Sequence, residues 1–239
     1  MSEWKKKRFW TDTTTEQGAA GWTVHLDGRV LKTPAKVTLT LPTGALAQAV
    51  AAEWDAQDGD IDPSSMPFTR SANAAIDKVA TQHGEVADML AAYGDADLLC
   101  YRADAPAELV ERQNAMWNPY LEWAAETLMA RLHPRTGVIH ESQDSVALAE
   151  LSKRVHALTE FELAAFHDLV SLSGSLILGF AAAQDLHPAP TIWASSRVDE
   201  MWQEEQWGED EEAQNVAEIK KASFLHAKSF LDAVRQSST

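Results

Sequence analysis

Two carboxylates near the end of the chain, Glu200 and Glu204, come nearest to acid–base chemistry in type and spacing. On a helix, side chains four residues apart lie close together, so one carboxylate could raise the pKa of the other and make it a general acid. Arg197 lies three residues before Glu200, and a cation in that position favours a solvated ion pair. The spacing leaves two interpretations open, an enzyme that uses a Glu200/Glu204 site and a charged face in solvent.

The same segment mixes tryptophans with acidic residues, a composition typical of surfaces that hold another protein. If the segment forms one continuous helix, one face of it carries residues at spacings of four, three, four and three: Trp193, Arg197, Glu200, Glu204 and Trp207. A glycine is expected to end this helix. The sequence therefore predicts a partner-binding face made of Glu200, Glu204, Trp207, Gly208, Trp193 and Arg197.

Signatures of common enzyme classes are missing from the sequence. It contains no glycine-rich phosphate loop, Gly-x-Gly-x-x-Gly, Gly-x-Ser-x-Gly or His-Glu-x-x-His. No two of the eight histidines have the four-residue spacing of a simple two-histidine zinc site. The single cysteine, Cys100, has apolar neighbours, which predicts a buried and unreactive thiol. We therefore expect no enzymatic activity, no cofactor, no metal and no nucleotide.

Charge and hydropathy limit the partners of the chain. Its 239 residues include 36 acidic and 20 basic side chains, a formal charge of −16. This charge disfavours nucleic acid and anionic membranes and favours a basic protein partner. The longest apolar stretch, residues 175–183, is far shorter than the roughly 20 residues that span a bilayer, so no membrane insertion is expected. One cysteine and no apolar signal segment predict a reducing, cytoplasmic location.

The hydrophobic pattern changes its period along the chain. Up to about residue 42 it has the two-residue period of strands, with strands predicted over residues 22–26 and 37–41 and a type I′ turn at Asp27-Gly28. Thr43 is then expected to cap a helix that packs on this sheet through Leu46, Val50 and Trp54.

From residue 68 onward the period is helical. Helices are predicted around residues 109–123, 146–158, 161–180 and 216–234. The first of these should kink or start afresh at Asn118-Pro119. Thr159 is expected to cap the helix over residues 161–180. The expected fold is α+β. A small β-rich N-terminal domain (residues 1–64), an antiparallel sheet with a packed helix, precedes a larger all-α C-terminal domain (residues 65–239).

Motifs along nearly the whole chain resemble one known family, the F₁-ATPase assembly chaperones that handle the α subunit of ATP synthase. The most specific are Leu26-Asp27-Gly28-Arg29-Val30-Leu31-Lys32-Thr33-Pro34 and Glu53-Trp54-Asp55-Ala56-Gln57 at their spacing. Further matching segments are Arg8-Phe9-Trp10, Met66-Pro67-Phe68-Thr69, Asp97-Leu98-Leu99-Cys100-Tyr101, Trp117-Asn118-Pro119 and Gln206-Trp207-Gly208. The missing presequence suggests the bacterial kind.

The resemblance implies a chaperone that binds the unassembled α subunit of F-type ATP synthase and prevents its aggregation until the β subunit replaces it. It places function at Glu200, Trp207, Gly208 and Trp54, and it gives the N-terminal motif residues, Asp27, Gly28, Arg29, Pro34, Glu53 and Trp54, a part in the fold. Many relatives have Trp-Asp-Pro where this chain has Trp117-Asn118-Pro119. An enzyme of unknown substrate and a plain structural adaptor remain the alternatives.

Overall fold

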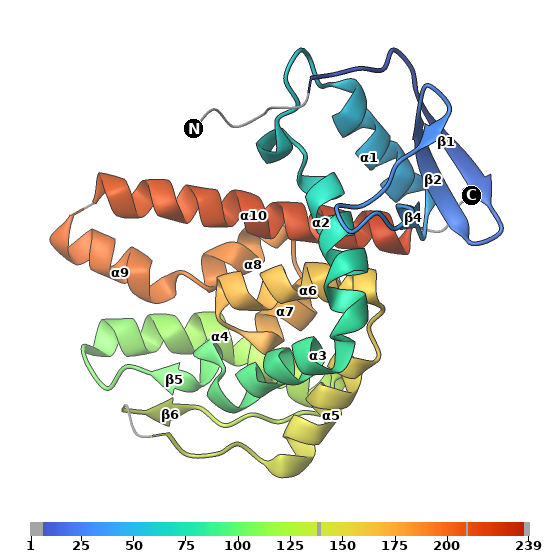
Figure 1. Ribbon diagram of the computed structural model, residues 1–239. Coiled ribbons are helices and arrows are strands. Elements are labelled where there is room, and N and C mark those ends of the chain that lie inside the picture. Colours follow the sequence, from blue (N-terminus) through green and yellow to red (C-terminus); the bar gives the residue numbers. More distant parts are fainter. Residues whose placement is uncertain (1–6, 138–139, 209, 237–239) are drawn as a thin grey trace. The chain divides into compact units, whose positions relative to one another are not determined.

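The computed structural model describes residues 7–137, 140–208 and 210–236. It has an antiparallel sheet near the N-terminus followed by a mostly helical region (Figure 1), which confirms the expected α+β class.

The sheet is built around β2 (Gly21–Leu26), which pairs antiparallel with β1 (Thr13–Gly18), β3 (Arg29–Val30) and β4 (Thr40–Leu41). Leu26 faces Arg29 across the hairpin of β2 and β3, so Asp27 and Gly28 form its two-residue turn. Both have positive φ, 47° and 77°, as a type I′ turn requires, and this prediction is confirmed. The Asp27 carboxylate also accepts hydrogen bonds from the backbone N–H groups of Asp12 and Thr11, which lower its pKa.

Two parts of the sheet differ from the prediction. The strand expected over residues 37–41 is reduced to Thr40–Leu41 and an isolated bridge between Lys32 and Thr38, and Val37 is half exposed. Only Leu39 and Leu41 of that run face the core. Strand β1 lies outside the predicted strands, because its polar sequence lacks the alternation that marks a half-buried strand.

Helix α1 (Gly44–Asp55) begins where it was predicted to begin. The Thr43 hydroxyl accepts a hydrogen bond from the Leu46 N–H at 3.2 Å, so the predicted cap is confirmed. Leu46 and Val50 are fully buried, and the helix packs on β1 and β2. Trp54 is only partly buried, and its ring lies 5.2 Å from the ring of Trp10.

The motif of residues 53–57 at the end of α1 connects this helix to the loop before the next helix and to the first turn of that helix. Glu53 accepts hydrogen bonds from the Phe68 and Thr69 N–H groups at 2.6 and 2.7 Å, so it caps helix α2 (Pro67–Asp77) in place of a local side chain. The Thr69 hydroxyl donates to the same carboxylate. Gln57 holds the loop before α2 by donating to Ser65 and accepting from the Asp62 N–H.

The other motif residues lie at turns and in a short strand. Arg29 is in β3 and exposed. Pro34 is exposed and precedes Ala35, whose N–H donates to Asp77 of α2 at 3.1 Å. Glu53 of one motif therefore binds the start of α2, and the residue that follows Pro34 of the other motif binds Asp77, the last residue of α2.

Replacing Glu53 by glutamine is expected to lower the free energy of unfolding by about 1–3 kcal/mol, because an amide nitrogen cannot accept from the N–H groups at the start of α2. For a chain of this size, about 1 kcal/mol corresponds to roughly 2–4 °C in melting temperature, which calorimetry resolves. Asp55→Asn is the matched control, since the Asp55 side chain is 66% exposed and contacts only Arg8, at 3.4 Å. Equal losses for the two variants would contradict a capping role for Glu53.

The remaining elements are mainly helical. They comprise η1 (Pro63–Ser65), η2 (Val79–Thr81), α3 (His83–Ala91), η3 (Ala92–Ala96), η4 (Leu98–Cys100), α4 (Ala107–Thr127), α5 (Ser145–His156), α6 (Glu160–Ser173), α7 (Leu176–Ala183), α8 (Ala189–Ser195), α9 (Val198–Trp207) and α10 (Glu211–Arg235). Two short parallel strands, β5 (Tyr101–Arg102) and β6 (Arg135–Thr136), pair beside α4.

Several predicted helix boundaries are corrected. Helix α4 runs through Pro119 without a break, because four of its buried side chains, those of Trp117, Tyr120, Leu121 and Ala124, offset the hydrogen bond lost at proline. The helix predicted over residues 161–180 is two helices, separated at Gly174, whose φ is +72°. Thr159 does cap α6, since its hydroxyl accepts from the Glu162 N–H and Glu162 accepts from the Thr159 N–H.

Helix α10 also departs from the predicted pattern. The helical pattern predicts an apolar stripe of Val216, Ile219, Ala227, Phe230 and Val234. The last three are buried as predicted, together with Phe224 and Leu231, but Val216 and Ile219 are 47% and 68% exposed.

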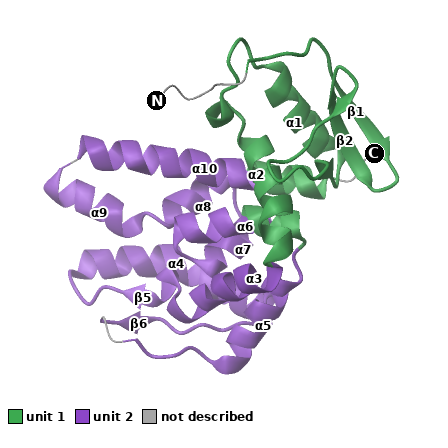
Figure 2. Ribbon diagram, in the orientation of Figure 1, with its two compact units in different colours: residues 1–82, 159–165, 229–239 green, residues 83–158, 166–228 purple. Residues whose placement is uncertain are grey.

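Two compact units divide the chain (Figure 2). One comprises residues 1–82, 159–165 and 229–239, and the other residues 83–158 and 166–228. The domain boundary at residue 64/65 stays a prediction. Among residues 7–137, 140–208 and 210–236, no helix combines the length and the apolar character needed to cross a bilayer.

Candidate functional site

The segment predicted as one helix from Trp193 to Trp207 is two helices, α8 and α9, and the prediction of a continuous helix is wrong. The chain leaves helical geometry at Arg197, where φ is −109° and ψ is 16°. The Ser196 hydroxyl donates to the carbonyl of Trp193 at 2.7 Å, and the carbonyl of Ser195 accepts from the indole N–H of Trp117 at 2.7 Å. These bonds occupy carbonyls that a continuous helix would use, so α8 ends here.

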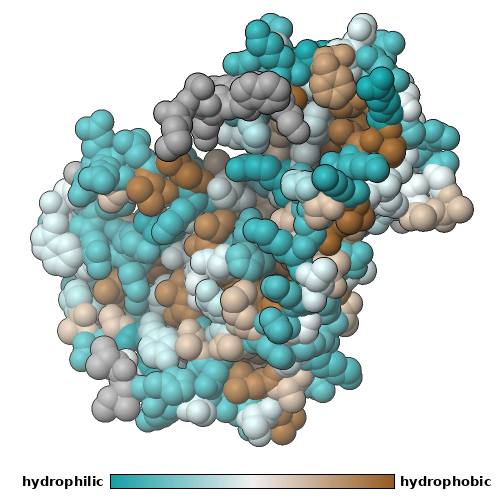
Figure 3. Space-filling model, viewed as in Figure 1, coloured by the Kyte–Doolittle hydropathy of each residue, from teal (hydrophilic) through white to brown (hydrophobic). Residues whose placement is uncertain are grey.

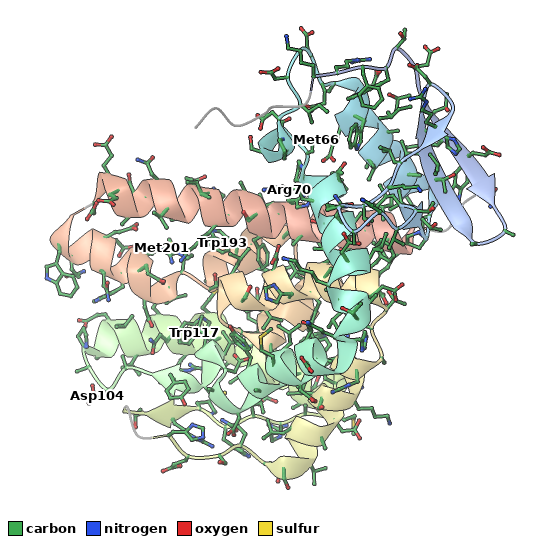
Figure 4. All side chains as sticks on the ribbon, viewed as in Figure 1. Met66, Arg70, Asp104, Trp117, Trp193 and Met201 are labelled. Atoms are coloured by element: carbon green, nitrogen blue, oxygen red, sulfur yellow. The ribbon has the colours of Figure 1, made fainter. Side chains whose placement is uncertain are left out.

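A groove lies between α8, α9 and the first half of α10, and we call it the α8–α10 groove. It encloses about 550 Å³ and is lined by Pro190, Trp193, Ala194, Arg197, Met201, Glu204, Gln214, Ala217, Glu218 and Lys221. Figure 4 shows Trp193 and Met201 in this region. Three predicted partner-binding residues, Trp193, Arg197 and Glu204, therefore come together here. Trp193 is only 5% exposed, because its ring packs against Phe224 of α10.

A second hollow lies on the other side of α9, and we call it the α4–α9 pocket. It also encloses about 550 Å³, and its lining comes from β5, the loop after it, α4, the residue after β6, and α9: Tyr101, Arg102, Ala103, Ala105, Pro106, Leu109, Gln113, Gly137, Asp199, Trp202, Gln203 and Trp207. Trp207, which was predicted to share a face with Trp193, lines this pocket instead and is 79% exposed.

Helix α9 thus forms a ridge between the groove and the pocket. Glu200 lines neither, and the helical repeat places it between Glu204 on one side and Trp207 on the other. Gly208 ends the helix as predicted, with a φ of +90° and an N–H that donates to the carbonyl of Glu204. Over α9 and α10, Figure 3 shows hydrophobic residues set among hydrophilic ones, and Met201, Val216 and Ile219 are exposed there.

Ion pairs fix two carboxylates of the ridge, those of Glu200 and Glu205. Arg197 donates to Glu200 at 2.6 Å, which is the pair that the sequence spacing favoured. Arg112 of α4 binds both oxygens of Glu205, at 2.7 and 2.8 Å, and its guanidinium lies 5.0 Å from the ring of Trp202. These hydrogen bonds from Arg112 lower the pKa of Glu205, so this carboxylate is held as an anion. A carboxylate that stays ionised and paired binds a cation but does not readily give up or take up a proton. The arrangement therefore suits recognition of a protein partner better than acid–base catalysis.

A buried polar network under the α4–α9 pocket was not anticipated from the sequence. The Arg102 side chain donates to the carbonyl of Leu99 and to Asn114 and Asn118, and its guanidinium lies over the ring of Trp117 at 5.1 Å. Asn118 therefore accepts a hydrogen bond from a buried cation.

Gln113 joins this network to α9. It accepts from the Ala103 N–H at 2.9 Å and donates to Asp199 at 2.6 Å. Most partners in this network are widely spaced along the chain. Only the placing of Asn114 and Asn118 four residues apart on α4 hinted at a shared face.

The residues described here show no obvious centre for metal or thiol chemistry. No group of three or more His, Cys, Asp or Glu side chains within the described ranges is arranged to hold a metal ion. Cys100 is 1% exposed, which confirms that its side chain is buried as predicted, and burial raises the pKa of its thiol to about 12.

Comparisons with known proteins connect these features to one family. The model of the ATP12 chaperone protein family matches residues 7–125. Over 222 residues the chain is 26% identical to the mitochondrial protein Atp12 of Schizosaccharomyces pombe. The matched region covers 88% of this chain and 76% of that protein.

Solved structures match over nearly the whole chain. The crystal structure of Atp12 from Paracoccus denitrificans matches with a TM-score of 0.95 and 49% identity, over 98% of this chain and 100% of that one. A candidate chaperone from Agrobacterium tumefaciens matches with a TM-score of 0.91 and 39% identity, over 96% of this chain and 86% of that one. Agreement at this level of identity, in both the sheet and the helical region, means that the chain belongs to the ATP12 chaperone family.

Proposed function

We propose that this protein binds the unassembled α subunit of F-type ATP synthase through the ridge of α9 and prevents its aggregation until the β subunit takes its place. Family membership makes the chain a chaperone of ATP synthase assembly. The choice of the α subunit as client follows from the resemblance of its motifs. The observation that carries the site is Trp207, an indole 79% exposed on an acidic ridge between two hollows.

The chemistry of the ridge suits a partner that must later be released. Large exposed aromatic side chains are enriched at the centres of protein interfaces, where a few anchors supply most of the binding energy. Around Trp207 the surface carries Glu200, Glu204 and Asp199, so a basic partner surface would be attracted and oriented. A few anchors within a polar rim give a contact that the correct subunit can displace.

Other properties follow as parts of the same proposal. The chain acts without enzymatic chemistry, since its relatives are named as chaperones and since Glu200 is paired with Arg197. We infer a cytoplasmic location in a bacterium, and no nucleotide, nucleic acid or membrane insertion takes part. The relative from S. pombe is named as mitochondrial.

The proposal is tested with purified α and β subunits of the same ATP synthase. Denatured α subunit is diluted into buffer and its aggregation is followed by light scattering. We expect a near-equimolar amount of the chaperone to suppress scattering and to co-elute with the α subunit in size-exclusion chromatography. Addition of β subunit should release the chaperone. Unchanged aggregation of the α subunit, or equal protection of an unrelated unfolded protein, would overturn the proposal.

A further inference from the structure

The α4–α9 pocket has aromatic walls that its own chain leaves open. Trp207, Trp202 and Tyr101 line it, and Trp207 is the most exposed of the large hydrophobic side chains described. Tyr101 is fixed at the edge by its hydroxyl, 3.1 Å from Nδ1 of His140, whose Nε2 lies 3.1 Å from Asp95. The Tyr101 wall is therefore held in place before any ligand arrives, whereas Trp207 projects into solvent at the end of α9.

The polar side chains on the floor of the pocket already form hydrogen bonds within the protein, so they offer few free donors to an anionic ligand. Three N–H groups of Arg102 bind Leu99, Asn114 and Asn118, and the ring of Trp117 covers its guanidinium. Gln113 uses its carbonyl oxygen on Ala103 and its amide on Asp199. What remains is the exposed indole of Trp207 and the carboxylate of Asp199, which accepts from Gln113 and interacts with the charge of Arg102 but forms no direct ion pair with a described residue.

The neighbouring Arg112 shows which ligand such a pair of groups holds. Its guanidinium lies over Trp202 at 5.0 Å and binds Glu205 at 2.7 and 2.8 Å, so one indole and one carboxylate together hold one arginine. Trp207 and Asp199 offer the same two kinds of group on the pocket side of α9, although they are eight residues apart on the helix and Trp202 and Glu205 only three. In the described part of the chain no cation lies over Trp207.

The charge around the opening agrees with a cationic occupant. Asp104 and Glu108 are exposed beside the lining residues Ala105, Pro106 and Leu109, and the chain as a whole has a formal charge of −16. Arg102 opposes this, but it is buried under Trp117 and bound to neutral carbonyl groups. Arg112 is neutralised by Glu205. A planar guanidinium stacks on an indole better than an ammonium group does, which selects arginine over lysine.

We propose that the α4–α9 pocket binds an arginine side chain from an exposed segment of the partner protein, with its guanidinium stacked on Trp207 and paired with Asp199, and its stem against Pro106 and Leu109. The inference rests on the proposed function only for the identity of the protein that carries this arginine.

The pocket is tested without any client by nuclear magnetic resonance of the indole N–H groups. N-acetyl-arginine amide is titrated into the ¹⁵N-labelled protein, and the Trp207 signal is assigned from its loss in Trp207→Phe. We expect a saturable shift of the Trp207 signal that Asp199→Asn weakens several-fold, because the substituted amide keeps the bond from Gln113 and loses the charge. N-acetyl-norleucine amide should leave the signal in place, and Glu122→Gln, on an exposed part of α4, should titrate like the wild type.

A Trp207 signal that does not move, or that moves equally with the norleucine amide, overturns the proposal. The aggregation assay separates this result from the proposed function. If Trp207→Ala and Asp199→Asn both lower the affinity for the α subunit by tenfold or more without changing the melting temperature, the arginine is the client's. If the Trp207 signal shifts as expected but the wild type does not protect the α subunit, the pocket inference stands and the proposed client is wrong.

Discussion

Reversing the charge of Glu200 is expected to weaken binding of the unassembled α subunit by about 2–5 kcal/mol, or roughly 30-fold to several thousand-fold, while leaving the fold almost unchanged. Glu200 stands on the ridge between the α8–α10 groove and the α4–α9 pocket and accepts from Arg197 at 2.6 Å. In Glu200→Lys, two cations would stand where the wild type has a neutral pair, facing a partner that we expect to be basic. The Glu200 side chain is 44% exposed, so its ion pair contributes only about 0–1 kcal/mol to stability.

A control reversal separates this local effect from loss of net charge. Glu122→Lys breaks a similar exposed pair, the one with Arg131 at 3.2 Å, and changes the total charge of the chain by the same amount. Both variants should melt near the wild-type temperature, and only Glu200→Lys should lose protection of the α subunit in light scattering. Full protection by Glu200→Lys would mean that the acidic ridge is merely solvated and that the client binds elsewhere, for example on the sheet.

The features that were predictable from sequence are those set by neighbouring residues. Asp27-Gly28 makes its turn because both positions need positive φ, and these residue types tolerate it. Thr43 and Thr159 cap helices through bonds to residues three positions later. In each case the partner lies within one turn of the chain, so local spacing was enough.

What failed depends on partners far away in sequence. The break between α8 and α9 involves the indole of Trp117, which is 78 residues from the carbonyl of Ser195 that it binds. The start of α2 is capped by Glu53, 15 residues before Phe68, although no residue next to the helix signals it. Hydrophobic periodicity records neither contact, because both are polar and non-local.

The structure brings together only part of the predicted partner-binding face, for the same reason. Trp193 and Trp207 look equivalent in a helical pattern, yet one is 5% and the other 79% exposed. Their difference comes from the turn at Arg197 and from α10, whose Phe224 packs against Trp193. Periodicity shows which residues share a face of one helix but does not show which faces a neighbouring helix covers.

Replacing Asp97 by alanine is expected to lower the free energy of unfolding by about 3–5 kcal/mol at about pH 5, because three buried donors lose their acceptor together. Asp97 is fully buried and accepts from the N–H groups of Leu99 and Ile177, at 3.0 and 3.1 Å, and from the Ser175 hydroxyl at 2.7 Å. It therefore joins the turn before β5 to the start of α7. The measurement is urea unfolding followed by circular dichroism, with Asp88→Ala, whose side chain is 75% exposed, as the control carboxylate.

The same variant should show a distinctive pH dependence. Burial raises the pKa of Asp97 from 3.8 to about 6, although its hydrogen bonds act in the opposite direction. Between these two values the folded protein binds a proton that the unfolded chain has released, so this contribution is complete below the unfolded pKa and is lost as pH rises through the folded one. At about 1.4 kcal/mol per pH unit between these two pKa values, the advantage of the wild type over Asp97→Ala should shrink by about 2 kcal/mol between about pH 4.5 and about pH 7.5. Comparing the two proteins cancels the titration of every other group. An advantage that stays constant or grows over this range would show that Asp97 is already ionised at the lower pH, with its hydrogen bonds outweighing its burial.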